Sequence, residues 1–189
     1  VYDQLFETLH RAQVSGKPLA LLGASYSYVP LLDEMEREDL SFALPAGSRL
    51  FDTGGFKGQY CEQDLDHFYN RLSAGFGVPR GKCTNMYGMT ELSTQFYDCG
   101  NTICPSVKFG PHWIRSRVIN PLTGEDAPIG ETGVLVHCDL AHFNIVTTIL
   151  TEDAAIKTES GFQLLGRADG TNAKGCSMAV EEFLQAAQG

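Results

Sequence analysis

The sequence Asn85-Met86-Tyr87-Gly88-Met89-Thr90-Glu91 places an aromatic ring, a glycine, a hydroxyl and a carboxylate within five consecutive residues, Tyr87 to Glu91. Such a group can hold a nucleotide. Tyr87 offers a flat face to a base, and Gly88 lets the backbone come close to a ligand. Thr90 offers a hydroxyl to a phosphate, and Glu91 offers a hard oxygen ligand to Mg²⁺. On local sequence alone, a tyrosine that closes a buried strand before a turn is an equally good interpretation.

The residues before this stretch alternate between helix and strand patterns. Apolar residues recur at helical spacing over 2–14, a continuous apolar run follows at 19–24, and a second helical pattern begins at Tyr28. A strand at 48–55 leads into an amphipathic helix with Leu65, Phe68, Tyr69, Leu72 and Phe76 on one face. Cys83 to Tyr87 supply the next strand of an α/β sheet. Tyr87 to Glu91 therefore follow the carboxyl end of a strand, where ligands of open α/β sheets bind.

The residues after Glu91 show a different pattern. Short strands separated by Gly, Pro and Asn turns are expected at 94–97, 113–119, 134–138, 143–150 and 162–165. A last helix is marked by apolar residues at Val180, Phe183, Leu184 and Ala187. The sequence thus predicts three parts: an α/β subdomain over 1–93, a β-rich, barrel-like or sandwich-like subdomain over 94–170 and a C-terminal helix over 171–189.

Composition excludes several classes of protein. The 189 residues carry a formal net charge of −9 without a Lys/Arg cluster, which argues against a nucleic-acid-binding surface. No apolar run approaches the ~20 residues of a membrane span, and no signal peptide is recognisable. Six cysteines without a CxxC pair favour reduced thiols, so we expect a cytoplasmic protein. The chain begins with Val1 and not Met, so we expect it to be part of a longer polypeptide.

Five short segments, in this order, resemble those of the adenylate-forming enzymes, which include acyl-CoA synthetases, adenylation domains and firefly luciferase. The segments are Gly54-Gly55, Tyr87 to Glu91, Gly130-Glu131-Thr132-Gly133, Thr151-Glu152-Asp153 and Gly166-Arg167-Ala168-Asp169. Residues 52–58, 111–115, 139–142 and 174–177 further resemble the acyl-protein synthetase (LuxE-like) branch. The resemblance covers about residues 18 to 187. It implies part of the large N-terminal domain of these enzymes, an α/β sheet layer followed by a smaller β-rich, barrel-like subdomain.

The resemblance also implies an activity. In these enzymes a carboxylic acid attacks the α-phosphate of ATP, giving acyl-adenylate and pyrophosphate, and the acyl group then moves to a thiol. Tyr87 should stack on adenine, and Gly88 should let the backbone approach the nucleotide. Thr90 should meet the α-phosphate and Glu91 should hold Mg²⁺. Gly54 and Gly55 belong to a segment that lines the acyl or nucleotide pocket.

Two later segments complete the nucleotide contacts that the resemblance implies. Asp153 should bind the ribose hydroxyls, although Glu152 stands where the family usually has glycine. Arg167 should contact ribose or phosphate, and Asp169 should sit at the hinge about which such enzymes reorient between half-reactions. Taken singly, these residues are better interpreted as turn caps and a surface ion pair. Their joint order favours the nucleotide site.

Cys176 is a candidate acyl acceptor. It follows Lys174-Gly175 and precedes the predicted last helix, so its thiol could lie near a helix N-terminus, where a thiolate is favoured. A thioester would keep the acyl group activated for a partner reductase or carrier protein. An inert, half-buried cysteine is an equally good interpretation.

A zinc site is a weaker hypothesis. Cys99, Cys104 and His112 could supply three ligands, with a fourth from His137, Cys138 or His142. The spacing is not that of a recognised zinc finger, and the alternative is loop cysteines that only pack.

One expected segment is missing. Adenylate-forming enzymes carry a Gly/Ser/Thr-rich phosphate loop upstream of the Tyr-Gly-x-Thr-Glu segment, and nothing between Val1 and Lys82 resembles it. The leading hypothesis is therefore an incomplete portion of an ATP-dependent acyl-protein synthetase acting on a fatty or other carboxylic acid, with little activity alone. The alternatives are a phenylacetate-CoA-ligase-like or secondary-metabolite adenylating enzyme, and a non-catalytic nucleotide-binding module.

Overall fold

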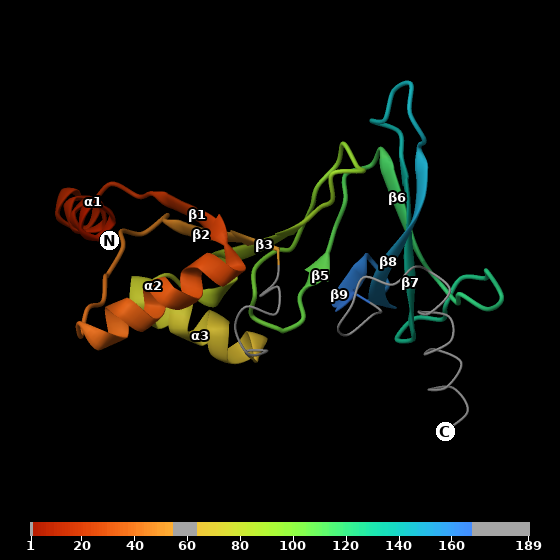
Figure 1. Ribbon diagram of the computed structural model, residues 1–189. Helices are drawn as coiled ribbons and strands as arrows, with labels where there is room; N and C mark the ends of the chain where they lie inside the picture. Colours follow the sequence, from red (N-terminus) through yellow and green to blue (C-terminus); the bar gives the residue numbers. More distant parts are fainter. Residues whose placement is uncertain (1, 55–63, 168–189) are drawn as a thin grey trace. The chain divides into compact units, whose positions relative to one another are not determined.

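The computed structural model describes residues 2–54 and 64–167 (Figure 1). The chain divides into two compact units, Val1–Tyr87 with Tyr97–Ser106, and Gly88–Phe96 with Val107–Gly189. The boundaries expected at 93/94 and 170/171 stay predictions, and the expected helix over 171–189 lies outside the described residues.

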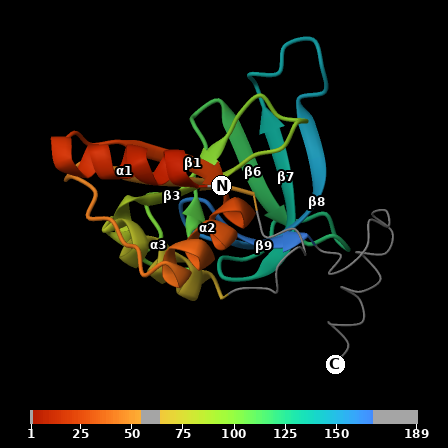
Figure 2. The same ribbon diagram turned by 60° about the vertical axis from the view of Figure 1, so that its left-hand side comes forward.

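A parallel sheet with helices on one face forms the first unit. Strand order is β1-β2-β3-β4, and β1, β2 and β3 are parallel. Each connection between sequential parallel strands has the same hand, so the helices α2 and α3 must lie on the same face of the sheet. Figures 1 and 2 show them there, side by side. The elements are α1 (Asp3–Ser15), β1 (Ala20–Ala24), α2 (Ser25–Arg37), β2 (Arg49–Thr53), α3 (Leu65–Phe76), η1 (Arg80–Lys82), β3 (Cys83–Tyr87) and β4 (Phe96–Tyr97).

The core of this unit forms where α2 and α3 bury their apolar faces. Phe68 and Phe76 of α3 are fully buried, and the ring of Phe76 stacks on Phe42 with centroids 6.4 Å apart. Helix α3 ends at Gly77, whose φ of 65° is left-handed. A Cβ there would lie 2.8 Å from the carbonyl oxygen of Phe42, so the helix end and the chain at Phe42 can approach only because this residue is glycine.

A buried carboxylate joins four elements of the first unit. Asp52, on β2, accepts hydrogen bonds from Ser25 Oγ (2.7 Å), Tyr69 OH (3.1 Å) and Asn85 Nδ2 (2.8 Å). These donors belong to the start of α2, to α3 and to β3. Burial, with the charge of Asp52 next, raises the pKa of Tyr69, which keeps this phenol protonated as a donor. The carboxylate therefore fixes both helices against the sheet.

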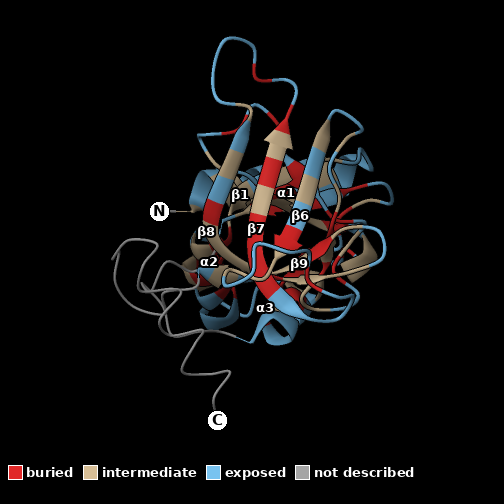
Figure 3. Ribbon diagram, turned by 90° about the vertical axis from the view of Figure 1, so that its right-hand side faces the viewer, coloured by how far each residue is buried: buried red, intermediate tan, exposed pale blue. Residues whose placement is uncertain are grey.

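The second unit is an antiparallel sheet of strand order β5-β9-β8-β7-β6. In Figure 3, β7 is buried along most of its length, whereas β6 and β8 carry mainly exposed and intermediate residues. None of the helices within residues 2–54 and 64–167 has the length and hydrophobicity that crossing a bilayer demands. The strands are β5 (Val107–Lys108), β6 (Ile114–Ile119), β7 (Thr132–Asp139), β8 (Thr148–Lys157) and β9 (Phe162–Arg167).

Two strand predictions differ from the structure. Strand β5 was not expected, because two residues carry no readable alternation. The strand expected at 143–150 is wrong at its start: β8 begins at Thr148, and Phe143 lies in the preceding loop with 86 % of its surface exposed. Asn144 has a left-handed backbone, with φ 64°, and Asp139 N donates to Thr147 O at 2.7 Å, which closes the loop. The apolar composition of 140–147 therefore does not indicate a strand.

A buried histidine lies in the core of the second unit. The imidazole of His137, on β7, packs against the rings of Phe96 and Phe162, with centroids 4.9 Å and 5.8 Å away. Its Nδ1 lies 2.8 Å from Ser116 Oγ on β6. Burial lowers the pKa of His137 to about 4, against an opposing effect of Asp139. The ring is therefore neutral at pH 7.

Replacement of Asp52 by Asn should destabilise the first unit by roughly 1–3 kcal/mol, because the new amide group would face buried donors that need an acceptor. Asp33→Asn is the matched control: Asp33 is exposed and Arg71, its partner, keeps Glu36. We expect this control to cost less than about 1 kcal/mol. Urea unfolding followed by far-UV circular dichroism measures both. Equal effects of the two substitutions would contradict the role of Asp52.

His137 should make the stability of the second unit depend on pH. The folded state binds fewer protons than the unfolded state between pH 6.5 and 4, so stability is fully present above pH 6.5 and falls as the pH drops towards 4. The loss approaches about 3 kcal/mol. Fluorescence of Trp113, the single tryptophan of the sequence, reports unfolding of this unit.

His137→Gln should remove much of this pH dependence, and His67→Gln, at an exposed position on α3, should leave it unchanged. If the free energy of unfolding depends on pH to the same extent in the His137→Gln variant, another group is responsible for the dependence.

Candidate functional site

Two of the predicted site residues lie at the same edge of the parallel sheet of the first unit. Thr53, the last residue of β2, pairs in register with Met86 of β3, and Thr53 Oγ1 lies 3.3 Å from Met86 O. Gly54 directly follows Thr53, and Tyr87 directly follows Met86 as the last residue of β3, so both lie at the carboxyl edge of the sheet. Gly54 has a φ of 74° and its carbonyl accepts a hydrogen bond from Ser25 Oγ at 2.9 Å. This edge is where α/β sheets bind ligands.

Tyr87 is more buried than a base-stacking residue requires. Its surface is 8 % exposed, and it is the last residue of β3. This burial leaves the strand-closing interpretation of Tyr87 in place. Two residues before the end of β3, Asn85 N donates to both oxygens of Asp98 at 3.2 Å, and Asn85 Nδ2 donates to Asp52.

Thr90 and Glu91 form an exposed polar pair in the second unit. They lie in a turn that Leu92 N closes by donating to Met89 O at 3.2 Å. Thr90 Oγ1 donates to Glu91 Oε2 at 3.1 Å, so the hydroxyl and the carboxylate proposed for phosphate and Mg²⁺ are neighbours in space as well as in sequence. Both oxygens are open to solvent and suit a phosphate with a divalent cation.

A second buried carboxylate holds the chain immediately after this turn. Asp139, fully buried at the end of β7, accepts hydrogen bonds from Ser93 N (3.1 Å), Thr94 Oγ1 (2.8 Å) and Ala141 N (3.0 Å). Thr94 in turn accepts from Trp113 Nε1 at 2.9 Å. Residues 139–142 carry part of the family resemblance, but no role was predicted for Asp139, because Ser93 and Thr94 lie 46 and 45 positions earlier in the sequence. A buried-strand pattern that ends in Asp was the only available signal.

The structure brings Asp153 and Arg167 together. They are cross-strand partners on β8 and β9, and Arg167 Nε lies 3.9 Å from Asp153 Oδ1. Arg167 Nη1 also lies 3.3 Å from Glu152 Oε2, the residue that stands in place of glycine. Glu152 lies inside β8 without a left-handed backbone. The side chain of Arg167 is 65 % exposed and that of Asp153 is 15 % exposed, so the guanidinium faces solvent beside a mostly buried carboxylate.

A β-bulge lies next to this pair. Ala154 pairs with Gly166, but Ala155 pairs with Leu164, so β9 has one extra residue, Leu165, at this point. Thr151 Oγ1 donates to Leu135 O and accepts from Asp153 N at 3.1 Å, which holds the strand on the other side of Asp153.

Three predicted site residues, Gly55, Asp169 and Cys176, lie outside the described residues. Of the three residues in the zinc hypothesis, Cys99 and Cys104 lie in the first unit and His112 lies in the second. Among residues 2–54 and 64–167, no group of three or more His, Cys, Asp or Glu side chains is arranged to hold a metal ion. The zinc site gains no support and stays a prediction.

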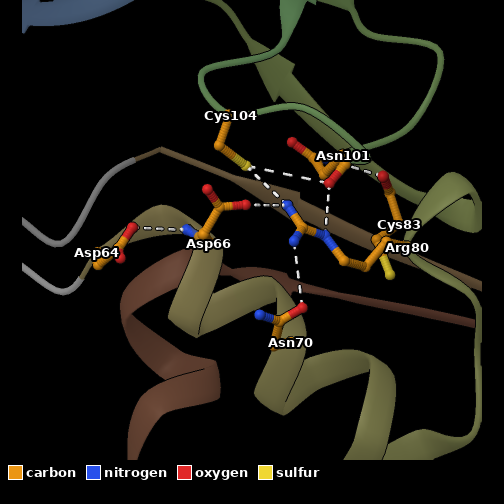
Figure 4. Close-up of polar contacts among 7 residues, drawn as sticks. All are labelled: Asp64, Asp66, Asn70, Arg80, Cys83, Asn101 and Cys104. Atoms are coloured by element: carbon orange, nitrogen blue, oxygen red, sulfur yellow. Dashed lines mark hydrogen bonds and ion pairs between the residues drawn. The ribbon is translucent and has the colours of Figure 1, made fainter.

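Cys104 instead contacts an arginine (Figure 4). Arg80 Nη2 lies 3.2 Å from Cys104 Sγ and 2.6 Å from Asp66 Oδ1. Arg80 Nε donates to Asn101 O at 2.7 Å, and Nη1 donates to Asn70 Oδ1 at 3.1 Å. Burial raises the pKa of the Cys104 thiol more than Arg80 lowers it. The thiol therefore packs in a structural cluster and is not activated.

The donors and acceptors of the second unit fit a nucleotide chemically. A carboxylate such as Asp153 can accept from both hydroxyls of a ribose, and a guanidinium such as Arg167 suits phosphate oxygens. A hydroxyl and a carboxylate at Thr90 and Glu91 suit a phosphate and a hard cation. No described residue of either unit supplies a glycine-rich phosphate loop.

Comparisons with known proteins agree with the fold. The chain is 22 % identical to the long-chain-fatty-acid–luciferin-component ligase of Vibrio harveyi in an alignment 195 positions long, which covers 98 % of this chain and 50 % of that protein. Among solved structures, 2-hydroxyisobutyryl-CoA ligase in complex with 2-HIB-AMP and CoA matches this chain with a TM-score of 0.61 and 15 % identity. The match covers 92 % of this chain and 41 % of that chain. ATP-bound MatB from Rhodopseudomonas palustris matches at a TM-score of 0.62, 19 % identity, covering 88 % and 33 %.

These matches confirm the predicted fold class, an α/β sheet layer followed by an antiparallel half-barrel subdomain, as part of the N-terminal domain of adenylate-forming enzymes. The chain spans about half the length of its curated relative. Residues 1–185 match the family described as "Acyl-protein synthetase, LuxE". The chain therefore belongs to the LuxE acyl-protein synthetase family.

Proposed function

We propose that this chain is a portion of an ATP-dependent enzyme that activates a carboxylic acid as acyl-adenylate and transfers the acyl group to a protein thiol. The observation that carries the proposal is the pairing of Asp153 with Arg167 across β8 and β9. It puts a carboxylate for a ribose diol beside an exposed guanidinium for a phosphate. Family membership and the ordered sequence segments support the same reaction.

The remaining nucleotide contacts would come from the motif that follows β3. Thr90 would donate to the α-phosphate, and Glu91 would hold Mg²⁺, whose charge offsets that of the phosphoryl oxygens when it is bound. Gly88 would admit the nucleotide close to the backbone, and Tyr87 would contact the adenine. Asp139, by fixing Ser93 and Thr94, would position Thr90 and Glu91.

The identities of the acyl chain and of the acyl acceptor are further parts of the proposal. The name of the Vibrio harveyi relative supports a long-chain fatty acid as substrate. In the transfer, a thiolate attacks the carbonyl carbon of the acyl-adenylate, a C–S bond forms, and AMP leaves with the electrons of the broken C–O bond. Cys176 is the proposed acceptor, Asp169 the proposed hinge, and a reductase or carrier protein the proposed recipient. A reduced thiol of this kind would operate in the cytoplasm.

The 189-residue chain alone should catalyse little carboxylate-dependent exchange of pyrophosphate into ATP, because residues 1–82 contain no phosphate loop to hold the leaving pyrophosphate. Incorporation of labelled pyrophosphate into ATP, with and without a fatty acid, measures this. Robust exchange that depends on the fatty acid would show that the chain is a complete adenylating enzyme.

Asp153→Asn should weaken binding of a hydrolysis-resistant acyl-sulfamoyl adenosine by about ten- to a hundredfold, because the ribose hydroxyls lose a charged acceptor. Asp126→Asn is the matched control in the same unit: its carboxylate is exposed and pairs with Arg117. Isothermal titration calorimetry measures both variants. Tight binding to the unaltered chain with no effect of Asp153→Asn would exclude the proposed ribose contact. Absence of binding to both the chain and its longer parent would exclude the proposed function.

A further inference from the structure

Two carboxylates of the second unit lie close to the guanidinium of Arg167. Nη1 of Arg167 lies 3.3 Å from Glu152 Oε2, which is within hydrogen-bond distance. Nε of Arg167 lies 3.9 Å from Asp153 Oδ1, which is too far for a hydrogen bond. The guanidinium is therefore held mainly by Glu152, a residue that has no part in the proposed nucleotide contacts.

The two carboxylates differ in how firmly the structure holds them. The backbone N–H of Asp153 donates to Thr151 Oγ1 at 3.1 Å, and Thr151 Oγ1 donates to Leu135 O on β7 at 3.0 Å. The side chain of Asp153 is short and mostly buried, whereas that of Glu152 is longer and 30 % exposed. Glutamate also keeps more rotamer freedom at such a site. Glu152 is therefore the carboxylate that can leave Arg167 when another anion arrives.

The charges of these three side chains do not balance. Two carboxylates face one guanidinium, so the group carries an excess of negative charge. A phosphate that approaches Arg167 meets repulsion from the carboxylate of Glu152 and must also take Nη1 from it. If Glu152 turns towards solvent, the repulsion falls and Nη1 can donate to a phosphate oxygen.

We propose that Glu152 competes with the nucleotide phosphate for Arg167 and thereby limits how strongly the site favours a phosphorylated nucleotide over a free nucleoside. This inference rests on the proposed function, because it takes Asp153 as the ribose contact and Arg167 as a phosphate contact. Without nucleotide, Glu152 holds Nη1. When the nucleotide binds, Asp153 accepts from the ribose, and the phosphate replaces Glu152 on Arg167.

The exposure of Arg167 sets the size of the effect. Its side chain is 65 % exposed, and ion pairs that are open to water contribute little to binding or stability. Loss of the competing charge should therefore change the affinity for a phosphate group only about two- to fivefold. Dissolved salt screens such charges, so the difference should shrink as the salt concentration rises.

Binding of AMP and of adenosine to the longer parent of this chain, measured by isothermal titration calorimetry, tests the inference. Glu152→Gln keeps the size of the side chain and removes its charge, so AMP should bind about two- to fivefold more tightly and adenosine equally well. Glu159→Gln is the matched control, because it removes the same charge at an exposed position in the turn between β8 and β9. It should change neither affinity.

Three results of the calorimetry would overturn the inference: unchanged AMP binding in Glu152→Gln, weaker AMP binding in that variant, or an equal gain for AMP and adenosine. The last result would show that Glu152 acts on the nucleoside and not on the phosphate. Far-UV circular dichroism checks that both variants are folded.

A second measurement does not depend on the proposed function. Inorganic phosphate, titrated into the 189-residue chain, should shift the Nε–Hε NMR signal of Arg167 at a lower concentration in Glu152→Gln than in the unaltered chain. Equal titrations would show that Glu152 does not compete for Arg167, and the inference would fail while the proposed function stood. If phosphate behaves as expected but neither AMP nor adenosine binds the parent, the competition for Arg167 is upheld and the proposed nucleotide site is excluded.

Discussion

Buried carboxylates hold the motif segment at both of its ends. Before the motif, the backbone of Asn85 donates to Asp98 and its side chain donates to Asp52. After the motif, the backbone of Ser93 and the hydroxyl of Thr94 donate to Asp139. An ionised carboxylate is costly to bury, and it is retained only where several donors face it. Thr90 and Glu91 lie between these anchors. They can therefore remain exposed while the backbone on either side of them is held in place.

The anchors divide the motif between two units. Asp52 and Asp98 belong to the unit that ends at Tyr87, and Asp139 belongs to the unit that begins at Gly88. Each unit therefore presents its own part of the proposed chemistry: an aromatic residue and a glycine at a sheet edge in the first, and hydroxyl, carboxylates and a guanidinium in the second. The peptide bond between Tyr87 and Gly88 links the two sets covalently.

Local pattern predicted much of this fold and little of its polar core. The strand Cys83 to Tyr87 and the helix carrying Phe68 and Phe76 follow from apolar periodicity, which depends only on neighbouring residues. The order of segments pointed to Asp153 and Arg167, but their pairing depends on strand register, which sequence alone does not contain. The roles of Asp52 and Asp139 were missed because their donors come from distant positions. The loop around Phe143 was predicted as a strand because its apolar composition resembles that of a strand. In the structure, Asn144 has a left-handed backbone, which a regular strand does not contain.

The bulge at Leu165 changes the phase of side-chain alternation along β9. On one side of it, Phe162 packs edge to face against Phe96; on the other side, Arg167 meets Asp153. In a regular ladder, strict alternation would fix the faces on which the side chains of these two positions lie relative to each other. A shift of register that reoriented one side chain would then reorient the other. Because of the extra residue between them, the register of β8 and β9 on one side of the bulge is not fixed by the register on the other side. Residues around Phe162 can then be substituted without a change of register at the proposed ribose contact.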